Sequence, residues 1–292
     1  MKIGLIINPR SGRGKGGRVG PHIHKLFRDS SCDILAYYTE RRGHARQLAE
    51  RIKNDVDIIV AAGGDGTVHE VVNGMVGGNA ALGVIPVGSG NDFAKPLKMP
   101  KDLKKAVQII LENKRQKIDL GKVGNLYFPN GFGIGFDAYV VKESNSIQKL
   151  RGVLIYLYAV IKQALKYSNR EMTIRVDGQV STKDVFLIAI GNGVAMGGGF
   201  YLTPEASLTD GQFDVCIIRG LKKWEIFLHL PKVFWGGHVK MKQVEMLKTN
   251  ELLIEAPGGV AAHADGELLP DESTRFEVEL IPRALEVIYN AK

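Results

Sequence analysis

The sequence predicts a two-domain protein, with an α/β N-terminal domain built on a parallel sheet and a mostly β C-terminal domain. Its 292 residues are more than one compact core usually holds. In the first third, short apolar runs alternate with helical patterns, which is typical of a parallel sheet. Beyond it, strand-like stretches follow one another. We therefore expect a domain of residues 1–122, completed by a C-terminal return of residues 283–292, and a second domain of residues 123–282.

Short strands and intervening helices account for the N-terminal domain. The apolar runs that predict its strands are residues 3–8, 34–39, 57–62 and 82–86. Helical patterns follow them, up to residue 28 and at residues 45–53, 68–75 and 103–112. Residues 118–123 return to extended structure and lead into the second domain.

Strands dominate the C-terminal domain. The strand-like stretches are residues 126–132, 172–176, 185–191, 213–219, 252–256 and 276–281. Helical insertions are expected at about residues 147–168 and 222–236. With strands in the majority, this domain is predicted to be mostly β.

The composition is that of an ordinary globular protein with an anionic partner. Hydrophobic residues make up 45% and charged residues 24%, which excludes a mainly disordered or fibrous chain. The formal net charge of +8 favours contact with nucleotide phosphate, nucleic acid or an acidic membrane surface. Because the basic residues are dispersed and no nucleic-acid module is recognisable, we expect no nucleic-acid partner.

Cysteine usage and hydropathy indicate a cytoplasmic protein. Cys32 and Cys216 are isolated in apolar stretches, so they form neither a disulfide framework nor a zinc site. No apolar run approaches the ~18 residues that span a bilayer. We expect a protein that associates peripherally with the inner face of the membrane. The oligomeric state stays open, a homodimer included.

A glycine-rich loop follows the first strand. Residues 8–12 read Asn-Pro-Arg-Ser-Gly, and glycines within residues 12–17 fit the Gly-x-Gly-x-x-Gly pattern, whose amides can bind phosphates. Glu40, which closes the second strand, keeps a dinucleotide-binding Rossmann site open as an alternative. The loop is not a Walker A motif, because Lys15 is followed by Gly16 where Ser or Thr would hold magnesium.

A second glycine loop carries a carboxylate. Residues 63–67, Gly-Gly-Asp-Gly-Thr, lie where a strand ends and a helix begins. Amides at a helix N-terminus favour anions, whereas Asp65 would repel a phosphate unless it acts through a cation or positions water. The loop therefore indicates a site for a phosphate and its metal. The alternative is a glycine turn in which Asp65 only caps the helix.

The same arrangement recurs after the next strand. Residues 86–92 read Pro-Val-Gly-Ser-Gly-Asn-Asp, and Asn91 or Asp92 is expected to enter a short helix. The carboxyl ends of parallel strands form the ligand crevice of an open sheet, so Asp65 and Asp92 should face the same space. Asp92 as a simple helix cap is the alternative.

Five motifs in this order resemble the diacylglycerol kinase catalytic family, which contains bacterial soluble lipid kinases and sphingosine and ceramide kinases. They are residues 8–12, 63–67, 88–92, 210–211 and 265–267, and they cover nearly the whole chain. The resemblance implies ATP and Mg²⁺ as cofactors and a nucleotide site between the two domains. The residues that it assigns to the nucleotide are Asn8, Pro9, Arg10, Ser11, Gly12, Thr39, Gly64, Asp65, Gly66, Thr67, Ser89, Asn91, Asp92 and Glu267.

The resemblance also implies two sets of magnesium-binding residues. A network of water and Mg²⁺ would link Asp65, Asp92 and Asp119. A structural magnesium site would consist of Ser207, Asp210 and Gln212. Asp210 would supply its carboxylate and the other two their backbone carbonyls. Members of the family often have a second acid just before Asp210, where this chain has Thr209, which puts the affinity of that site in doubt. A plain turn is the alternative.

Asp265 stands where the family places its general base. A carboxylate there would take the proton from the attacking lipid hydroxyl, as phosphoryl transfer requires. From the residues alone, the Asp-Gly-Glu run at 265–267 is better interpreted as a turn, and the resemblance reverses that preference. His263 is a tempting base, but a histidine beside strand residues is more often structural.

The helical insertions mix apolar and basic residues, which suits an anionic membrane surface. In residues 147–167 these residues are Leu150, Val153, Leu154, Leu157, Ile161 and Leu165 with Lys149, Arg151, Lys162 and Lys166. In residues 221–239 they are Lys222, Lys223, Trp224, Phe227, Phe234 and Trp235. The alternative is that both helices pack on the β domain and expose only their lysines.

We therefore expect an ATP-dependent kinase that transfers the γ-phosphoryl group to a lipid hydroxyl, with diacylglycerol as the expected acceptor and phosphatidic acid as the product. Another lipid acceptor, such as a sphingoid base or phosphatidylglycerol, stays open. A soluble-metabolite kinase is a further alternative, because NAD kinases and phosphofructokinases share a Gly-Gly-Asp-Gly element. Neither kind of kinase is expected to have the motifs that this chain has at residues 88–92 and 265–267 in the same places. A non-catalytic nucleotide-binding regulator is disfavoured, because the expected carboxylates are all present.

Overall fold

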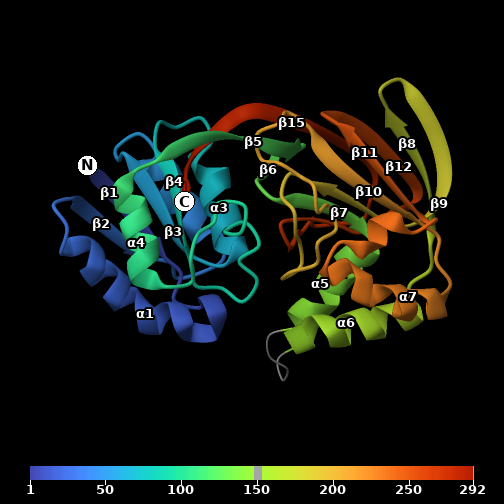
Figure 1. The fold of residues 1–292 in the computed structure, drawn as a ribbon, viewed down its shortest axis with the longest axis horizontal. Helices are drawn as coiled ribbons and strands as arrows, with labels where there is room; N and C mark the ends of the chain where they lie inside the picture. The colour runs from blue at the N-terminus through green and yellow to red at the C-terminus, as the bar shows by residue number, and fades with distance from the viewer. Residues whose placement is uncertain (148–152, 292) are drawn as a thin grey trace. The chain divides into compact units, whose positions relative to one another are not determined.

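The computed structural model describes residues 1–147 and 153–291, and the chain forms two compact units (Figure 1). The N-terminal unit consists of Met1–Leu120 and Pro282–Lys292, and the C-terminal unit of Gly121–Ile281. The strands β5 (Arg115–Val123) and β15 (Ser273–Ile288) each contribute residues to both units. Among the described residues, every helix is too short or too polar to cross a bilayer.

The N-terminal unit is built on a parallel sheet with strand order β2-β1-β3-β4, and the end of β15 runs parallel to β4. Its strands are β1 (Lys2–Ile7), β2 (Asp33–Tyr38), β3 (Ile58–Gly63) and β4 (Ala81–Pro86). Its helices are α1 (Ser11–Arg28), α2 (His44–Ile52), α3 (Asp65–Met75) and α4 (Leu103–Glu112). The predicted α/β domain with a parallel sheet is confirmed.

Burial on both faces explains why the strands of this sheet are continuous apolar runs. Every residue of β3 and β4 is buried, as expected for a parallel sheet covered by helices on its two sides. Local signals set the ends of α4. The Asp102 carboxylate accepts a hydrogen bond from the Lys105 amide at 2.9 Å, and Asn113 ends the helix in the left-handed region. The carboxyl ends of β1, β3 and β4 thus lead directly into the three glycine-rich loops.

The segment after β4 differs from the prediction. Residues 92–98 form consecutive turns instead of the short helix predicted to begin at Asn91 or Asp92. Asn91 and Lys98 both have positive φ values, of 55° and 53°. Pro96 has no N–H to donate to the Asp92 carbonyl, so a regular helix cannot propagate from Asp92.

The C-terminal unit is mostly β-structure, as predicted, and its strands pair antiparallel. Its strands besides parts of β5 and β15 are β6 (Leu126–Phe128), β7 (Gly131–Gly135), β8 (Arg170–Val176), β9 (Gln179–Gly191), β10 (Phe213–Arg219), β11 (Val244–Thr249), β12 (Glu251–Val260), β13 (Ala262–Ala264) and β14 (Glu267–Leu268). The strand order is β14-β13-β7-β9-β8-β12-β15. The long strand β9 pairs with β8 through its first half and with both β7 and β10 through its second half.

A phenylalanine cluster fills the core of this unit. Phe128 stacks on Phe132 and on Phe213 with 5.7 Å between ring centroids in both pairs, and Phe276 meets Phe132 edge to face at 5.8 Å. These rings come from β6, β7, β10 and β15, so residues far apart in the sequence share one core. Packed aromatic pairs of this kind add to the free energy of burial.

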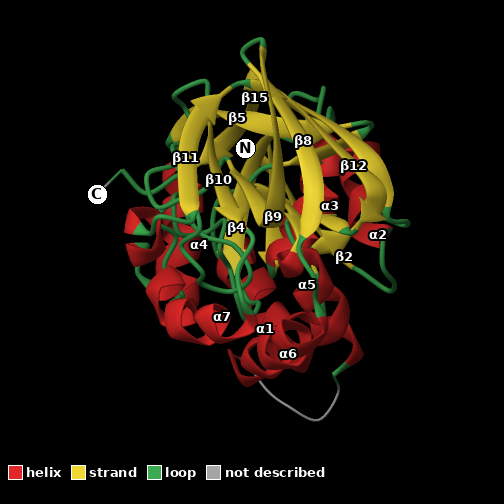
Figure 2. Ribbon diagram, turned by 90° about the vertical axis from the view of Figure 1, so that its right-hand side faces the viewer, coloured by secondary structure: helices red, strands yellow, loops and turns green. Residues whose placement is uncertain are grey.

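Helices gather at one end of the C-terminal strands (Figures 1 and 2). They are α5 (Phe136–Ser146), α6 (Val153–Lys166), α7 (Lys223–His229), and the 3-10 helices η1 (Leu230–Phe234) and η2 (Gly237–Lys240). The two expected insertions correspond to α6 and to α7 with η1. Helix α5 was not predicted, because its polar sequence lacks a clear apolar period. Lys149, Leu150 and Arg151 lie outside the described residues, as do the side chains of Val153 and Leu154.

Candidate active site

Asn8 joins the first glycine loop to the second. Its backbone N–H donates to the Ala62 carbonyl at 3.0 Å, and its side-chain amide donates to Thr67 Oγ1 at 2.9 Å. The Asn8 side-chain oxygen accepts from the Arg10 amide at 3.0 Å. A Cβ atom at Gly16 would lie 2.0 Å from the Asn8 carbonyl oxygen. Only glycine therefore allows α1 to approach this loop so closely.

The second and third loops touch through their glycine backbones. A Cβ atom on Gly88 would lie 2.4 Å from the Gly64 Cα, and one on Gly64 would lie 3.1 Å from the Gly88 Cα. The first loop joins them, because a Cβ on Gly12 would lie 2.4 Å from the carbonyl oxygen of Val87. The three loops thus form one cradle lined by backbone, whose shape depends on the absence of side chains.

The third loop is closed by a single side chain. Asn91 accepts a hydrogen bond from the Gly88 amide at 2.9 Å and donates one to the Gly88 carbonyl at 2.8 Å. Its φ of 55° is tolerated better by asparagine than by most residues. Ser89, in the middle of this closed turn, is exposed.

The three carboxylates predicted to share magnesium each contact the N-terminal unit itself. Asp65 accepts a hydrogen bond from the Phe93 amide at 3.2 Å, and buried Asp92 pairs with Lys95 at 2.7 Å. Asp119, which is 1% exposed, accepts from the Arg283 amide at 2.7 Å. In the described ranges, no three His, Cys, Asp or Glu side chains lie close enough together to ligate a metal directly. The water-linked magnesium network therefore stays a prediction.

The remaining nucleotide-site residues border the same loops. The Ser11 amide donates to the Asn8 carbonyl at 3.1 Å, and the Pro9 carbonyl accepts from Gly17 at 2.9 Å. Thr39 follows β2 and donates to the Ile7 carbonyl at 2.9 Å. Gly66 lies in the first turn of α3, where free backbone amides point outward. These residues fit a bound polyphosphate, because the cradle consists of closely packed glycine backbone beside the N-terminus of α3.

Asp265 lies in a tight hairpin of the C-terminal unit. Asp265 and Gly266 join β13 to β14 with φ values of 51° and 85°, the signature of a type I′ turn. The Asp265 carboxylate accepts hydrogen bonds from the amides of Asn130 at 3.1 Å and Gly131 at 2.9 Å. The turn interpretation of this segment is correct, and the same turn holds the carboxylate in a defined orientation. Glu267, the first residue of β14, is half-buried.

His263 and Asp137 form a buried pair two residues before Asp265. His263 Nδ1 accepts a hydrogen bond from the Gly266 amide at 3.2 Å, so the Nε2 atom carries the proton of the neutral ring. Nε2 lies 3.3 Å from Asp137 Oδ2. Within the described part of the chain, that carboxylate oxygen is buried without a hydrogen bond. The structural contacts of His263 support the interpretation that it is not itself the base.

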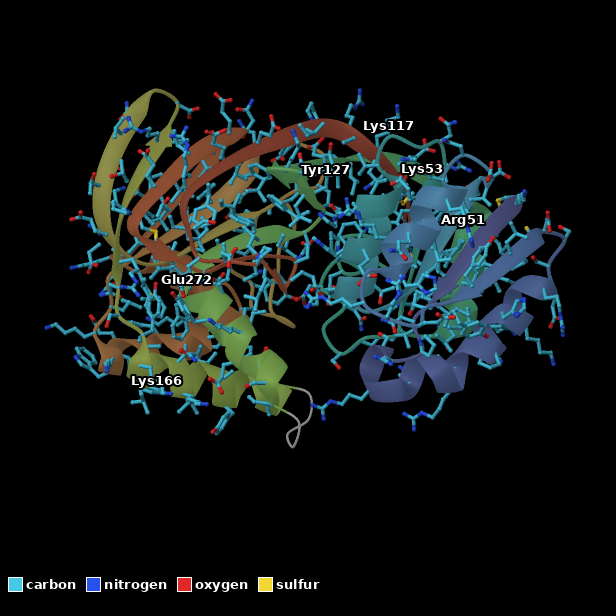
Figure 3. The ribbon with its side chains drawn as sticks, turned by 180° about the vertical axis from the view of Figure 1, so that it is seen from behind. Arg51, Lys53, Lys117, Tyr127, Lys166 and Glu272 are labelled. Atoms are coloured by element: carbon cyan, nitrogen blue, oxygen red, sulfur yellow. The ribbon has the colours of Figure 1, made fainter. Side chains whose placement is uncertain are left out.

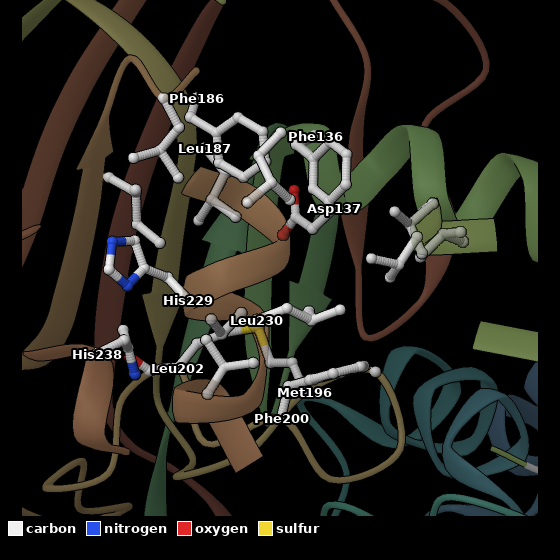
Figure 4. A pocket seen from close by; sticks show the side chains of 18 of the residues that line it. Phe136, Asp137, Phe186, Leu187, Met196, Phe200, Leu202, His229, Leu230 and His238 are labelled. Atoms are coloured by element: carbon white, nitrogen blue, oxygen red, sulfur yellow. The ribbon is translucent and has the colours of Figure 1, made fainter. Parts of the chain in front are cut away.

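An apolar pocket extends from this pair between the helices and the sheet of the C-terminal unit (Figure 4). Its cavity has a volume of about 100 Å³. The lining includes Phe136, Asp137, Val160, Leu187, Met196, Leu202, Ile226, Leu230 and His263. Figure 4 shows the Asp137 carboxylate among aromatic and aliphatic side chains, with His229 and His238 across the pocket from it. The pocket can therefore hold a short apolar segment, such as a few methylene groups, whose polar end would lie near Asp137.

Burial shifts the titration of the groups around this pocket. Desolvation raises the pKa of the Tyr167 hydroxyl well above its usual range, with the charge of Asp137 adding to the shift. Desolvation also raises the pKa of the Cys216 thiol to about 12. It lowers the pKa of His238, which the Leu202 carbonyl partly opposes. Tyr167 and His238 are thus uncharged at neutral pH, which suits an apolar ligand.

Comparisons with known proteins place this chain in a family. Residues 2–123 match the model of the diacylglycerol kinase catalytic domain, and residues 131–289 match that of the YegS C-terminal NAD kinase beta sandwich-like domain. A relative from Staphylococcus haemolyticus named diacylglycerol kinase is 33% identical over 90% of this chain and 81% of its own length. The chain belongs to the diacylglycerol kinase family. The resemblance predicted from the motifs is confirmed.

A second relative supports the same assignment, and a solved structure shows the same fold. A protein of the same name from Staphylococcus carnosus is 31% identical over 90% of this chain and 87% of its own length. A crystal structure of a diacylglycerol kinase from Bacillus anthracis has the same fold, with a TM-score of 0.75 and 24% identity over 99% of this chain and 97% of that chain.

In the turn expected to hold the structural magnesium of the diacylglycerol kinase family, the ammonium group of Lys248 pairs with the Asp210 carboxylate. Asp210 Oδ1 accepts from the Gln212 amide at 3.3 Å, and Oδ2 pairs with Lys248 Nζ at 3.1 Å. The Ser207 hydroxyl lies 3.4 Å from the Thr209 amide nitrogen. Magnesium takes oxygen ligands at about 2.0–2.1 Å in an octahedron, which leaves no place for an ammonium group at the same carboxylate oxygen. These residues therefore do not fit a magnesium site.

Two residues that the sequence reasoning missed bear on this diacylglycerol kinase fold. Asp137 follows a glycine-rich strand and begins a helix, which is the same signal that identified Asp65. Lys248 had no local signal, because its position beside Asp210 depends on how β10 and β11 pair.

Proposed function

We propose that this protein is an ATP-dependent lipid kinase that transfers the γ-phosphoryl group to the free hydroxyl of diacylglycerol and forms phosphatidic acid. The observation that carries the proposal is the apolar pocket of the C-terminal unit, with His263 in its wall two residues before Asp265. Membership of the diacylglycerol kinase family and the names of its relatives support this choice of acceptor.

The N-terminal unit binds ATP in this proposal. The close approach of Gly12, Gly64 and Gly88 forms the cradle for the phosphates, and the N-terminus of α3 adds its positive dipole. Asp65, Asp92 and Asp119 would hold Mg²⁺ through water. When bound, Mg²⁺ would neutralise part of the phosphate charge that develops during transfer.

The C-terminal unit binds the acceptor and removes its proton. An acyl chain occupies the apolar pocket, and the hydroxyl end lies toward Asp265. The Asp265 carboxylate takes the hydroxyl proton while the oxygen forms a bond to the γ-phosphorus and the bond to the β-phosphate oxygen breaks, which releases ADP. The Asn130 and Gly131 amides fix the carboxylate in place for this step.

The outer face of the helices contacts the membrane that contains the acceptor. While Val160 and Ile226 are buried and line the pocket, the same helices expose large apolar side chains. The exposed residues include Leu157, Ile161, Leu165, Trp224, Leu228 and Trp235. Lys166, at the end of α6 in Figure 3, adds positive charge to this face. A surface that combines interfacial aromatics with lysines suits an anionic bilayer.

The test is transfer of labelled γ-phosphate from ATP to lipids in mixed micelles with MgCl₂. Diacylglycerol should become labelled, and triacylglycerol, which has no hydroxyl, serves as the matched control. A sphingoid base, phosphatidylglycerol and NAD complete the panel. Label on one of these in place of diacylglycerol would replace the proposed acceptor. Absence of any labelled product despite ATP binding would contradict the kinase mechanism.

Membrane contact has a separate measurement. Sedimentation with vesicles of anionic phospholipid should recover the protein, and neutral vesicles should recover less. Trp224→Ala and Trp235→Ala together should weaken the recovery, whereas Val180→Ala, at an exposed apolar position of β9, should not. Equal recovery of the tryptophan variant would exclude this face as the contact.

A further inference from the structure

Strand pairing places a lysine opposite a buried aspartate at the start of β10. In the antiparallel pair β10·β11, Asp214 lies directly opposite Lys248. The Asp214 side chain is only 6% exposed, and its Oδ2 atom lies 3.2 Å from Lys248 Nζ. A buried carboxylate without a counter-charge is costly, so this register supplies one.

The same ammonium group reaches a second carboxylate. Lys248 Nζ lies 3.1 Å from Asp210 Oδ2 in the turn that precedes β10. Lys248 therefore bridges the turn and both strands, which is the work that a structural metal would do at this place. Its side chain is 42% exposed, so water reaches the pair from one side.

Charge counting agrees with the geometry. A divalent cation is favoured where several acidic oxygens converge, and Thr209, which precedes Asp210, supplies no carboxylate. The Lys248 charge then offsets one of the two carboxylates that remain, Asp210 and Asp214. Mg²⁺ entering this turn would meet the repulsion of the ammonium group as well as the loss of its own hydration shell.

We propose that Lys248 is a built-in cation that replaces the structural magnesium at the Asp210 turn, so that the folded C-terminal unit does not depend on Mg²⁺. The inference does not rest on the identity of the acceptor lipid. It separates two roles of magnesium: the Mg²⁺ that accompanies ATP is required for transfer, and the stability of the fold is independent of it.

Thermal unfolding of the full-length, nucleotide-free protein tests the proposal. The melting temperature of the unmodified protein should be the same in chelator and in MgCl₂ at matched ionic strength. Lys248→Met should lower it by about 2–6 °C in chelator, because two carboxylates lose their counter-charge. MgCl₂ should then restore part of the loss, and adding Asp210→Asn to this variant should abolish the restoration.

Lys183→Met is the matched control. Lys183 pairs with Glu245 at 2.7 Å in the same unit but away from the Asp210 turn, so its variant should show no response to MgCl₂. Binding of Mn²⁺ followed by electron paramagnetic resonance gives a second readout. Lys248→Met should gain a bound ion that Asp210→Asn removes, whereas the unmodified protein should have no ion that depends on Asp210.

One result would overturn the proposal without any lysine variant. If chelator lowers the melting temperature of the unmodified protein and Asp210→Asn removes that dependence, the turn binds a metal. This comparison decides the question even where Lys248→Met fails to fold. In that case Lys248→Arg, which keeps the positive charge, should fold and remain insensitive to Mg²⁺.

Discussion

The two units build their sites from different materials. In the N-terminal unit, Gly12, Gly64 and Gly88 bring three loops together, and a single Cβ atom would push their backbones apart. In the C-terminal unit, the pocket is lined by side chains such as Phe136, Val160 and Leu202. A site made of backbone has one shape, whereas a site made of side chains can change its shape by substitution.

This difference suits the two substrates of a lipid kinase. A triphosphate has a fixed arrangement of oxygens. Backbone amides can point toward these oxygens only where the loops approach one another closely. An acyl chain has no polar groups to orient, and any apolar lining of sufficient volume accepts it. We therefore expect substitutions in the first unit to act on ATP binding and those in the second to act on the acceptor.

The largest effect is expected on turnover, for a substitution that leaves ATP binding unchanged. Asp265→Asn keeps the hairpin and the oxygen that accepts from Asn130 and Gly131, but it removes the proposed base. Turnover should fall by a factor of about 10²–10⁴, and the ATP dissociation constant should stay unchanged. Steady-state kinetics and calorimetric titration with ATP measure the two quantities. Comparable turnover in the variant would reject Asp265 as the base.

Crowding the backbone cradle should give the next largest effect. Gly88→Ala places a Cβ atom 2.4 Å from the Gly64 Cα, which should cost about 1–3 kcal/mol in the free energy of unfolding and weaken ATP binding. Gly17→Ala is the control, because its Cβ would be 3.4 Å from the nearest atom, the Pro9 carbonyl oxygen, in a helix. Urea unfolding and ATP titration should leave the control close to the unmodified protein.

Filling the pocket should change the acceptor and spare the nucleotide. Val160→Phe adds volume inside the apolar wall, so the KM for long-chain diacylglycerol should rise about tenfold while the KM for ATP is constant. Val180→Phe makes the same change at a position that is 55% exposed and should alter neither constant. If a folded Val160→Phe variant keeps its lipid KM, the acyl chain binds elsewhere.

The smallest effect is a pH dependence that belongs to the C-terminal unit. Burial lowers the pKa of His238 below its ordinary value of 6.5, so the folded state binds fewer protons than the unfolded state as the solution becomes acidic. The contribution of neutral His238 to the free energy of unfolding is complete above pH 6.5 and is lost as the pH falls below that value through the folded pKa. The drop in melting temperature between neutral pH and about pH 5 should be smaller for His238→Gln. An equal drop would show that His238 does not titrate on unfolding.

Local sequence signals predicted much of the fold. Residues 213–219 form a strand with the expected bounds, because the aromatic and β-branched residues of this segment favour extended structure. The Gly-Gly-Asp-Gly-Thr loop was expected at a strand end followed by a helix, and α3 begins at Asp65, three residues before the predicted start at residue 68. Helix α5 was missed, because its helical state comes from packing on α6 and β7 and not from an apolar period of its own.

Helices α6 and α7 bury some of their apolar residues and expose others. Val160 and Ile226 pack inward, as the structural alternative required, while Leu165 and Trp224 stay exposed beside lysines. A helix with apolar residues on two faces has no single period, so the sequence could not say which face would be covered.

The sequence by itself determined the class of the fold, the family and the positions of the glycine loops, because each follows from residues close together in the chain. Only the tertiary structure decided that Gly64 touches Gly88, that the His263 ring meets Asp137, and that Lys248 lies opposite Asp214. These contacts depend on strand order and register, which are set by the packing of the whole unit. The pocket and the lysine at the Asp210 turn could therefore not be predicted from any one segment.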